Sequence, residues 1–91
     1  MYLEIVSPEA SLVAGEIESI TLPGINGEFQ MLNNHAAIVS LLSQGKVTFA
    51  GSPTIAPGFE NKFTQQEGKW VLEISGGTVE MNNNKVIVLA D

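Results

Sequence analysis

Residues that favour tight turns recur about every ten positions along this chain, so only short extended segments fit between them. Asn26-Gly27, Gly76-Gly77 and the asparagines at 82–84 tolerate the positive φ angles that tight hairpins require. The apolar residues between the turns alternate or form short runs, without the period of about 3.6 residues that marks a helix. The sequence therefore predicts one all-β domain over residues 1–91, an antiparallel β-sandwich or flattened barrel of about ten short strands.

The expected strands follow the alternation of apolar residues. The clearest of them are residues 2–6, 28–32, 46–49, 69–74, 78–81 and 85–90. Ser7-Pro8-Glu9 ends the first strand, and residues 11–14 form a short extended piece that we expect to end at Gly15. The closing segment is apolar on both faces, which is typical of a central strand buried on both sides.

The alternation slips between Glu16 and Leu22, because Ile17 has one parity while Ile20 and Leu22 have the other. One extra residue near Glu18, forming a β-bulge, would bring all three side chains to one face. The alternative is that Ile17 packs on the opposite face. We expect the bulge.

Residues 51–68 are the least strand-like part of the chain. Two prolines and two glycines within residues 51–58 favour a loop or an interrupted edge strand. Residues 59–64 can form a hairpin arm that turns around residues 65–68 into the next strand. In that strand Trp70 alternates with apolar residues, which favours core packing over the alternative of an exposed aromatic platform for sugars.

Charge and residue content disfavour several classes of function. Ten acidic residues against four lysines give a net charge of −6, which disfavours nucleic acid and anionic lipid headgroups as partners. No apolar run approaches the ~20 residues of a membrane span, and no export signal is visible, so we expect a soluble protein without direct membrane insertion. The absence of cysteine excludes a disulfide framework.

Candidate catalytic residues are sparse. His35 is the single histidine, whereas a metal enzyme needs three or four converging ligands. No nucleophile elbow supports a hydrolytic triad, and Gly76-Gly77 lacks the Lys-Ser/Thr of a phosphate loop. We therefore expect no catalytic residue, no metal and no cofactor. From the residues alone, His35 fits a corner residue hydrogen-bonded to backbone, and Glu28 fits a solvated strand end.

Several motifs together resemble the epsilon subunit of F-type ATP synthase, which is called delta in mitochondria. They are a Gly-Glu-Phe strand start at residues 27–29, the pair His35-Ala36, and the glycine that closes the following apolar run, Gly45. Ser75-Gly76-Gly77 and the ending VIVLAD at residues 86–91 resemble the closing hairpin of that family. The resemblance covers nearly the whole chain and implies the family's N-terminal ten-stranded β-sandwich.

The resemblance implies a non-catalytic rotor subunit that clamps the gamma subunit to the membrane c-ring and reaches the catalytic head through gamma. It would lie peripherally on the cytoplasmic face of the inner (plasma) membrane, as part of the synthase. Family members usually continue into two α-helices that inhibit hydrolysis and, in some members, bind ATP. This chain ends at Asp91, so we expect no C-terminal helical hairpin.

The family's contact residues are carried over by position. The implied c-ring contact consists of Gly27, Glu28 and Phe29. The implied gamma contact consists of Ser7, His35, Ala36 and Ile38. The resemblance also implies structural glycines at Gly24, Gly45, Gly76 and Gly77.

The sequence departs from the family pattern around the histidine. Asn33-Asn34 replaces the usual Pro-Gly, Ala37 replaces a usual proline, and Gln30 stands where glycine is common. The loss of two prolines predicts a looser corner. The alternative function, from another class, is a free-standing β-sandwich module that binds a carbohydrate or peptide, for which residues 51–58 are the candidate edge.

Overall fold

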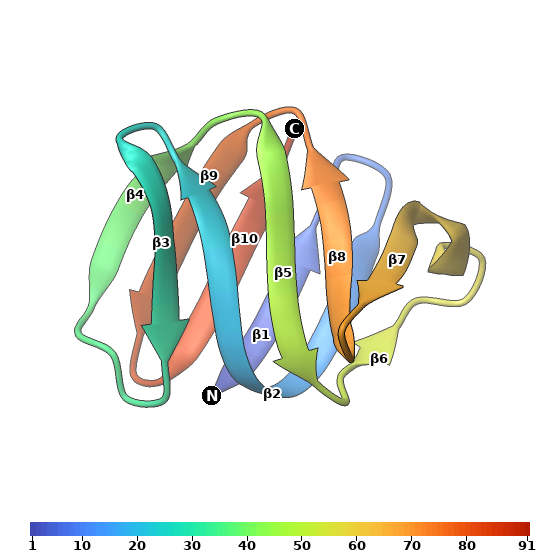
Figure 1. Ribbon diagram of the computed structural model, residues 1–91, viewed down its shortest axis with the longest axis horizontal. Helices are drawn as coiled ribbons and strands as arrows, with labels where there is room; N and C mark the ends of the chain where they lie inside the picture. The colour runs from blue at the N-terminus through green and yellow to red at the C-terminus, as the bar shows by residue number, and fades with distance from the viewer.

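The computed structural model describes residues 1–91 and consists almost entirely of β-strands (Figure 1). One short 3-10 helix, η1, interrupts them at Glu60–Lys62. The strands are β1 (Tyr2–Val6), β2 (Ser11–Gly24), β3 (Gly27–Leu32), β4 (Ile38–Leu42), β5 (Gly45–Gly51), β6 (Thr54–Ile55), β7 (Phe63–Gln66), β8 (Lys69–Ile74), β9 (Gly77–Asn82) and β10 (Lys85–Ala90). The predicted all-β sandwich of about ten strands is confirmed.

The strands form two facing layers (Figure 1). The back layer has the order β1-β10-β9-β4, and the front layer has the order β3-β2-β5-β8-β7. The long strand β2 belongs to both, because its first half pairs with β1 and its second half pairs with β3 and β5. The pairing is antiparallel as predicted, except that β1 and β10 run parallel.

Strand β2 confirms one prediction and corrects another. The register between β2 and β5 shifts between Ile17 and Ser19, so the expected bulge is present and Ile17, Ile20 and Leu22 all enter the core. Residues 11–14 are not a separate piece, because β2 continues through Gly15. Gly15 has a φ of 148° and no side chain, which lets Pro53 approach the strand closely. The glycine therefore lies inside β2 and does not end it.

The core lies between the two layers and contains no buried polar or charged residue. Its fully enclosed side chains include Phe49 in the front layer and Leu3, Val79 and Val88 in the back layer. Strand β10 is central in its layer, but the prediction that it is buried on both sides is wrong. Leu89 is 52% exposed, because nothing in the chain covers the outer face of the back layer.

The segment between β5 and β8 lies along one edge of the sandwich. As expected for an interrupted edge strand, β6 has only two residues and pairs with Val13 and Ala14 of β2. The hairpin arm begins later than predicted, since η1 precedes β7 and the turn narrows to Glu67-Gly68. Phe63 anchors the arm in the core, where its ring makes edge contacts with Phe49 and Trp70 at 6.2 and 6.3 Å.

Candidate functional site

The two residues singled out by sequence, Glu28 and His35, lie at opposite ends of the sandwich. Glu28 is in the first pair of β3 and faces Pro23 across the β2–β3 hairpin. His35 lies beyond the last residue of β3, at the corner that leads into β4. Both residues are exposed. The two ends are called the Glu28 end and the His35 end below.

At the His35 end, backbone hydrogen bonding shapes the corner. The His35 backbone nitrogen donates to Leu32 O at 3.1 Å, and Asn34 adopts a φ of 63° inside this turn. The ring nitrogen Nδ1 lies 2.7 Å from Ala36 O. Because a carbonyl oxygen only accepts, Nδ1 carries a hydrogen in this contact, and Nε2 is left free for a partner. The backbone-bonded reading of His35 is therefore confirmed.

An apolar surface spreads over the outer face of the back layer. Val39, Leu41 and Leu89 are 77%, 57% and 52% exposed, and the neighbouring strands add the half-buried Val6 and Ile87. The register places Leu41, Leu89 and Val6 in one row across the layer, with Thr78 between the first two. The next row carries Val39 and Ile87, with Glu80 between them and Glu4 beyond Ile87. These five apolar residues are called the outer face below. Exposed apolar patches of this kind mark interaction sites.

Two of the expected gamma-contact residues, Ser7 and Ile38, lie beside the outer face and not on it. Ile38 is half-buried and packs against the core, because its partner in β9 is the buried Met81. Ser7 follows Val6 at the Glu28 end, roughly 15–20 Å along the strand direction from the His35 corner. The outer face lies between Ser7 and His35 and connects them. Sequence reasoning missed Val39 and Leu41, because residues 38–42 are apolar at nearly every position and no alternation marks the outward side of the strand.

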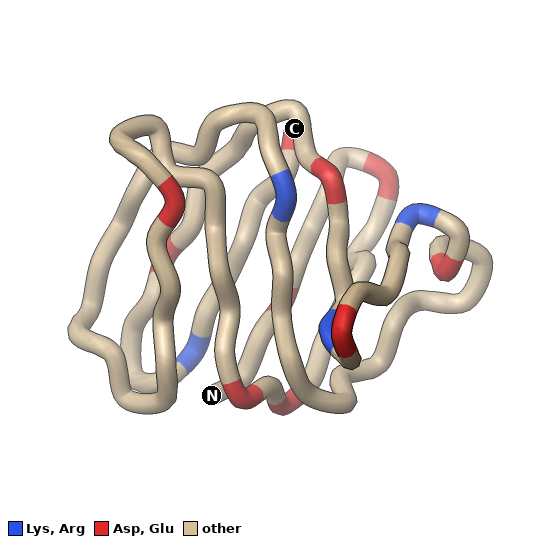
Figure 2. Tube along the Cα trace, in the orientation of Figure 1, with Lys and Arg blue, Asp and Glu red and all other residues tan.

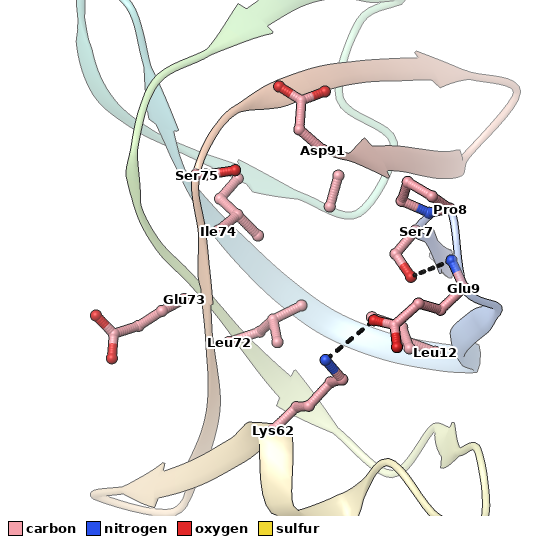
Figure 3. A pocket seen from close by; sticks show the side chains of 11 residues that line it. Ser7, Pro8, Glu9, Leu12, Lys62, Leu72, Glu73, Ile74, Ser75 and Asp91 are labelled. Carbon is pink, nitrogen blue, oxygen red and sulfur yellow. Dashed lines mark hydrogen bonds and ion pairs between the residues drawn. The ribbon is translucent and has the colours of Figure 1, made fainter.

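Several turns gather at the Glu28 end. Ser43 N donates to Pro23 O at 2.8 Å, and Asp91 N donates to Gly76 O at 3.1 Å, which brings the β2–β3, β4–β5 and β8–β9 turns to one end. A groove of about 500 Å³ opens beside them (Figure 3). Its rim carries an ion pair in which Lys62 Nζ lies 3.2 Å from Glu9 Oε1. Figure 2 shows acidic positions at both ends of the molecule and few basic ones.

The glycines singled out by sequence occupy tight places. A Cβ on Gly77 would collide with Leu89 O, and the φ of 148° at this residue disfavours any side chain. A Cβ on Gly45 would come within 2.7 Å of Pro23, and one on Gly24 within 2.8 Å of Gly27 O. A Cβ on Gly76 would lie 3.0 Å from Asp91 Oδ2, the end of a side chain that can move aside. Larger residues at the other three positions would displace the backbone or proline atoms that face them.

Acidic and histidine side chains do not gather anywhere as a group of three that could hold a metal ion. Trp70 is half-buried against the core and offers no open aromatic platform. None of the helices is long and apolar enough to cross a membrane. The chain presents an outer face whose exposed apolar side chains lie among Glu4 and Glu80, bordered by the His35 corner, and a separate end that carries Glu28.

Comparison with known sequences points in the same direction. A family model described as "ATP synthase, Delta/Epsilon chain, beta-sandwich domain" matches residues 1–91. The chain is 35% identical over 89 residues to the ATP synthase epsilon chain of Chlorobaculum tepidum, covering 98% of this chain and 86% of that one. It is 33% identical to the epsilon chain of Campylobacter concisus, of which it spans 60% of the length.

Solved structures agree on the fold. A chain of the Tetrahymena thermophila mitochondrial ATP synthase, solved as central stalk and c-ring, superposes with a TM-score of 0.68 at 15% identity, covering 99% of this chain and 62% of that chain. A chain of the Euglena gracilis mitochondrial ATP synthase superposes with a TM-score of 0.72 at 21% identity, covering 97% and 48%. With the family model spanning every residue, this chain belongs to the family of ATP synthase delta/epsilon chains and corresponds to its β-sandwich domain.

Proposed function

We propose that this chain is a non-catalytic rotor subunit of F-type ATP synthase, which clamps the gamma subunit to the c-ring. Ion-driven rotation of the ring would then turn gamma inside the catalytic head. The observation that supports the proposal is one sandwich that exposes large apolar side chains on its outer face and, separately, a carboxylate at its Glu28 end. The complex would hold the chain peripherally at the cytoplasmic face of the membrane.

The outer face, together with His35 and Ala36, is the proposed gamma contact. Burying Val39 and Leu41 against a partner would contribute about 1.5–3 kcal/mol for each fully covered side chain. His35 Nε2 is a polar atom free to bond a partner at one border, and Ser7 marks the other border. Ile38 supports this surface from the core side of β4.

The Glu28 end is the proposed c-ring contact, formed by Gly27, Glu28 and Phe29. Glu28 is an exposed carboxylate beside a tight hairpin, so it can accept hydrogen bonds from basic and amide groups on polar loops. Phe29 is half-buried and packs against the core, which fixes the strand that carries Glu28. One solved neighbour comes from a structure of the central stalk and c-ring and the other from a structure of OSCP, F1 and the c-ring, which agrees with this proposal.

Torque transfer requires stiffness between the two contacts. The back layer supplies it, because its strands are joined along their full lengths by ladder hydrogen bonds and run between the two ends. The core between the layers contains only apolar residues, so no buried polar group needs a hydrogen-bond partner when the sandwich is under load. A packed core of this kind transmits strain.

Site-directed cross-linking tests this assignment, because the natural chain has no cysteine. Leu41→Cys, carrying a short photoactivated cross-linker, should form a product with gamma in the assembled synthase. Glu28→Cys should form one with the c subunit. Gln65→Cys, on the exposed edge strand β7, is the matched control and should form neither. If Leu41→Cys and Glu28→Cys give no products with these subunits while the assembly is intact, the proposed function is wrong.

A further inference from the structure

At the His35 end, two polar turns far apart in sequence are joined by side-chain amides. Asn84 Nδ2 donates to Asn33 Oδ1 at 2.8 Å, and Asn84 Oδ1 accepts from the Asn34 backbone nitrogen at 2.7 Å. The single amide of Asn84 therefore holds the β3–β4 corner through both its donor and its acceptor. Met1 N also donates to Asn33 Oδ1, at 2.9 Å. Neither turn is covered by other parts of the chain.

The corner has little else to fix its position. Residues 32–37 are all exposed, so no core packing holds them, and the bond from His35 N to Leu32 O lies within the corner itself. Asn84 is anchored better, because it is half-buried and its carbonyl oxygen accepts from Tyr2 N at 3.0 Å. Its φ of 59° belongs to the tight turn between β9 and β10. Asn84 thereby connects the back layer, to which its backbone is bonded, with the β3–β4 corner, which its side chain holds.

We propose that Asn84 is a positioning residue for the gamma contact, which fixes the corner so that His35 stands in register with the outer face. This inference rests on the proposed function. Strand β4 starts directly after the corner and carries Val39, so a fixed corner orders the histidine and the apolar surface together. Pre-ordering matters because a partner that must order a loose segment loses part of its binding free energy.

The turn offers a matched pair of substitutions. Asn83 and Asn84 are neighbours with φ angles of 51° and 59°, which glycine adopts freely, so Asn83→Gly and Asn84→Gly both keep the backbone of the turn. Only Asn84→Gly removes the amide that holds the corner. Asn84→Asp is a graded third variant, because it keeps an acceptor for Asn34 N and loses the donor to Asn33 Oδ1.

Two measurements on the full chain test the inference. One is hydrogen exchange of the Asn34 backbone amide, and the other is the affinity for purified gamma, measured by calorimetry. Asn84→Gly should raise Asn34 exchange to near the level of an open loop and weaken gamma binding about 5- to 30-fold. Asn83→Gly should leave both near wild type, and Asn84→Asp should keep the Asn34 protection with a smaller loss of affinity. Circular dichroism melting verifies that each variant is folded.

The outcomes separate the two proposals. If the Asn34 backbone amide is protected equally in Asn84→Gly and wild type, the positioning role of Asn84 is overturned. Equal affinity of these two proteins for gamma overturns it as well. If Asn83→Gly weakens gamma binding as much as Asn84→Gly does, the turn backbone is responsible and the positioning role of Asn84 is also overturned. If the wild-type chain does not bind gamma, the proposed function fails, and the positioning role fails with it even where the Asn34 amide is protected.

Discussion

At Glu28 a single carboxylate stands exposed at the edge of a tight hairpin, so a charge reversal changes the surface and not the core. Glu28→Lys should shift the free energy of unfolding by about 0.5 kcal/mol or less. Contact with basic c-ring loops should weaken by about 0–1 kcal/mol if the contact is wet, and by about 2–5 kcal/mol if it is desolvated. ATP-driven ion pumping in reconstituted vesicles measures the loss of coupling.

Glu18→Lys makes the same change of charge at the bulge of β2, away from the Glu28 end, and serves as the control. Pumping should stay at wild-type level in this variant. A wet contact predicts that the defect of Glu28→Lys shrinks further at high salt. Should Glu28→Lys lower the melting temperature as far as a core truncation does while pumping stays normal, Glu28 would be structural and the assignment of the two surfaces would be wrong.

Val39 and Ile38 are chain neighbours that point to opposite sides of β4, and they provide the second prediction. Val39→Ser should leave the melting temperature nearly unchanged, because the side chain is already exposed, and should weaken gamma binding by about 1–2 kcal/mol. Ile38→Ser should instead destabilise the fold by about 1–3 kcal/mol. Urea unfolding and calorimetry with gamma separate the two effects; a reversed pattern would refute the orientation of β4.

The same pair shows what sequence leaves open at the residue scale. A run such as residues 38–42 is apolar at nearly every position, so both parities look equally suited to the core. The pairing of Ile38 with buried Met81 decides the inward side, and that pairing is a long-range fact. The slip among Ile17, Ile20 and Leu22 was readable because polar residues separate the apolar ones there.

Among the elements, β7 provides the third prediction, because Phe63 alone ties its exposed arm into the core. Phe63→Ala should destabilise the domain by about 3–5 kcal/mol, the usual cost of removing a buried phenylalanine. Two edge-on ring contacts, to Phe49 and Trp70, are lost with it. Urea unfolding measures the change, and Gln65→Ala on the same strand is the neutral control. A loss below about 1 kcal/mol would mean that the arm is not anchored this way.

Strand positions were largely predictable, whereas strand continuity was not. The β9–β10 turn at Asn83-Asn84 lies where its composition places it, because positive φ angles need such residues. The β2–β3 turn falls one residue earlier than predicted, at Ile25-Asn26, and Gly27 opens β3 with a φ of 121°. The prediction that the strand ends at Gly15 is wrong. In sequence, a glycine that ends a strand looks the same as one that lets another segment of the chain pack closely against the strand. Here Pro53, 38 positions later, decides between them.

For the molecule as a whole, the fourth prediction is that the chain neither hydrolyses nor measurably binds ATP. It has no phosphate loop and no arginine to hold a polyphosphate, and its net charge of −6 repels one. Calorimetric titration of ATP into micromolar protein should give only heats of dilution, and phosphate release should match the buffer. Saturable binding would reveal a nucleotide site outside this account.

The central claim is that the chain turns together with both gamma and the c-ring, and covalent tethering tests it most directly. In vesicles that contain the synthase, a chain with Leu41→Cys and Glu28→Cys would be cross-linked to gamma and to the c-ring at once. We predict that ATP-driven ion pumping persists after tethering, because parts that rotate together lose nothing when joined. Pumping that is active before cross-linking and abolished after it would show that the joined subunits move relative to one another, and would contradict the account.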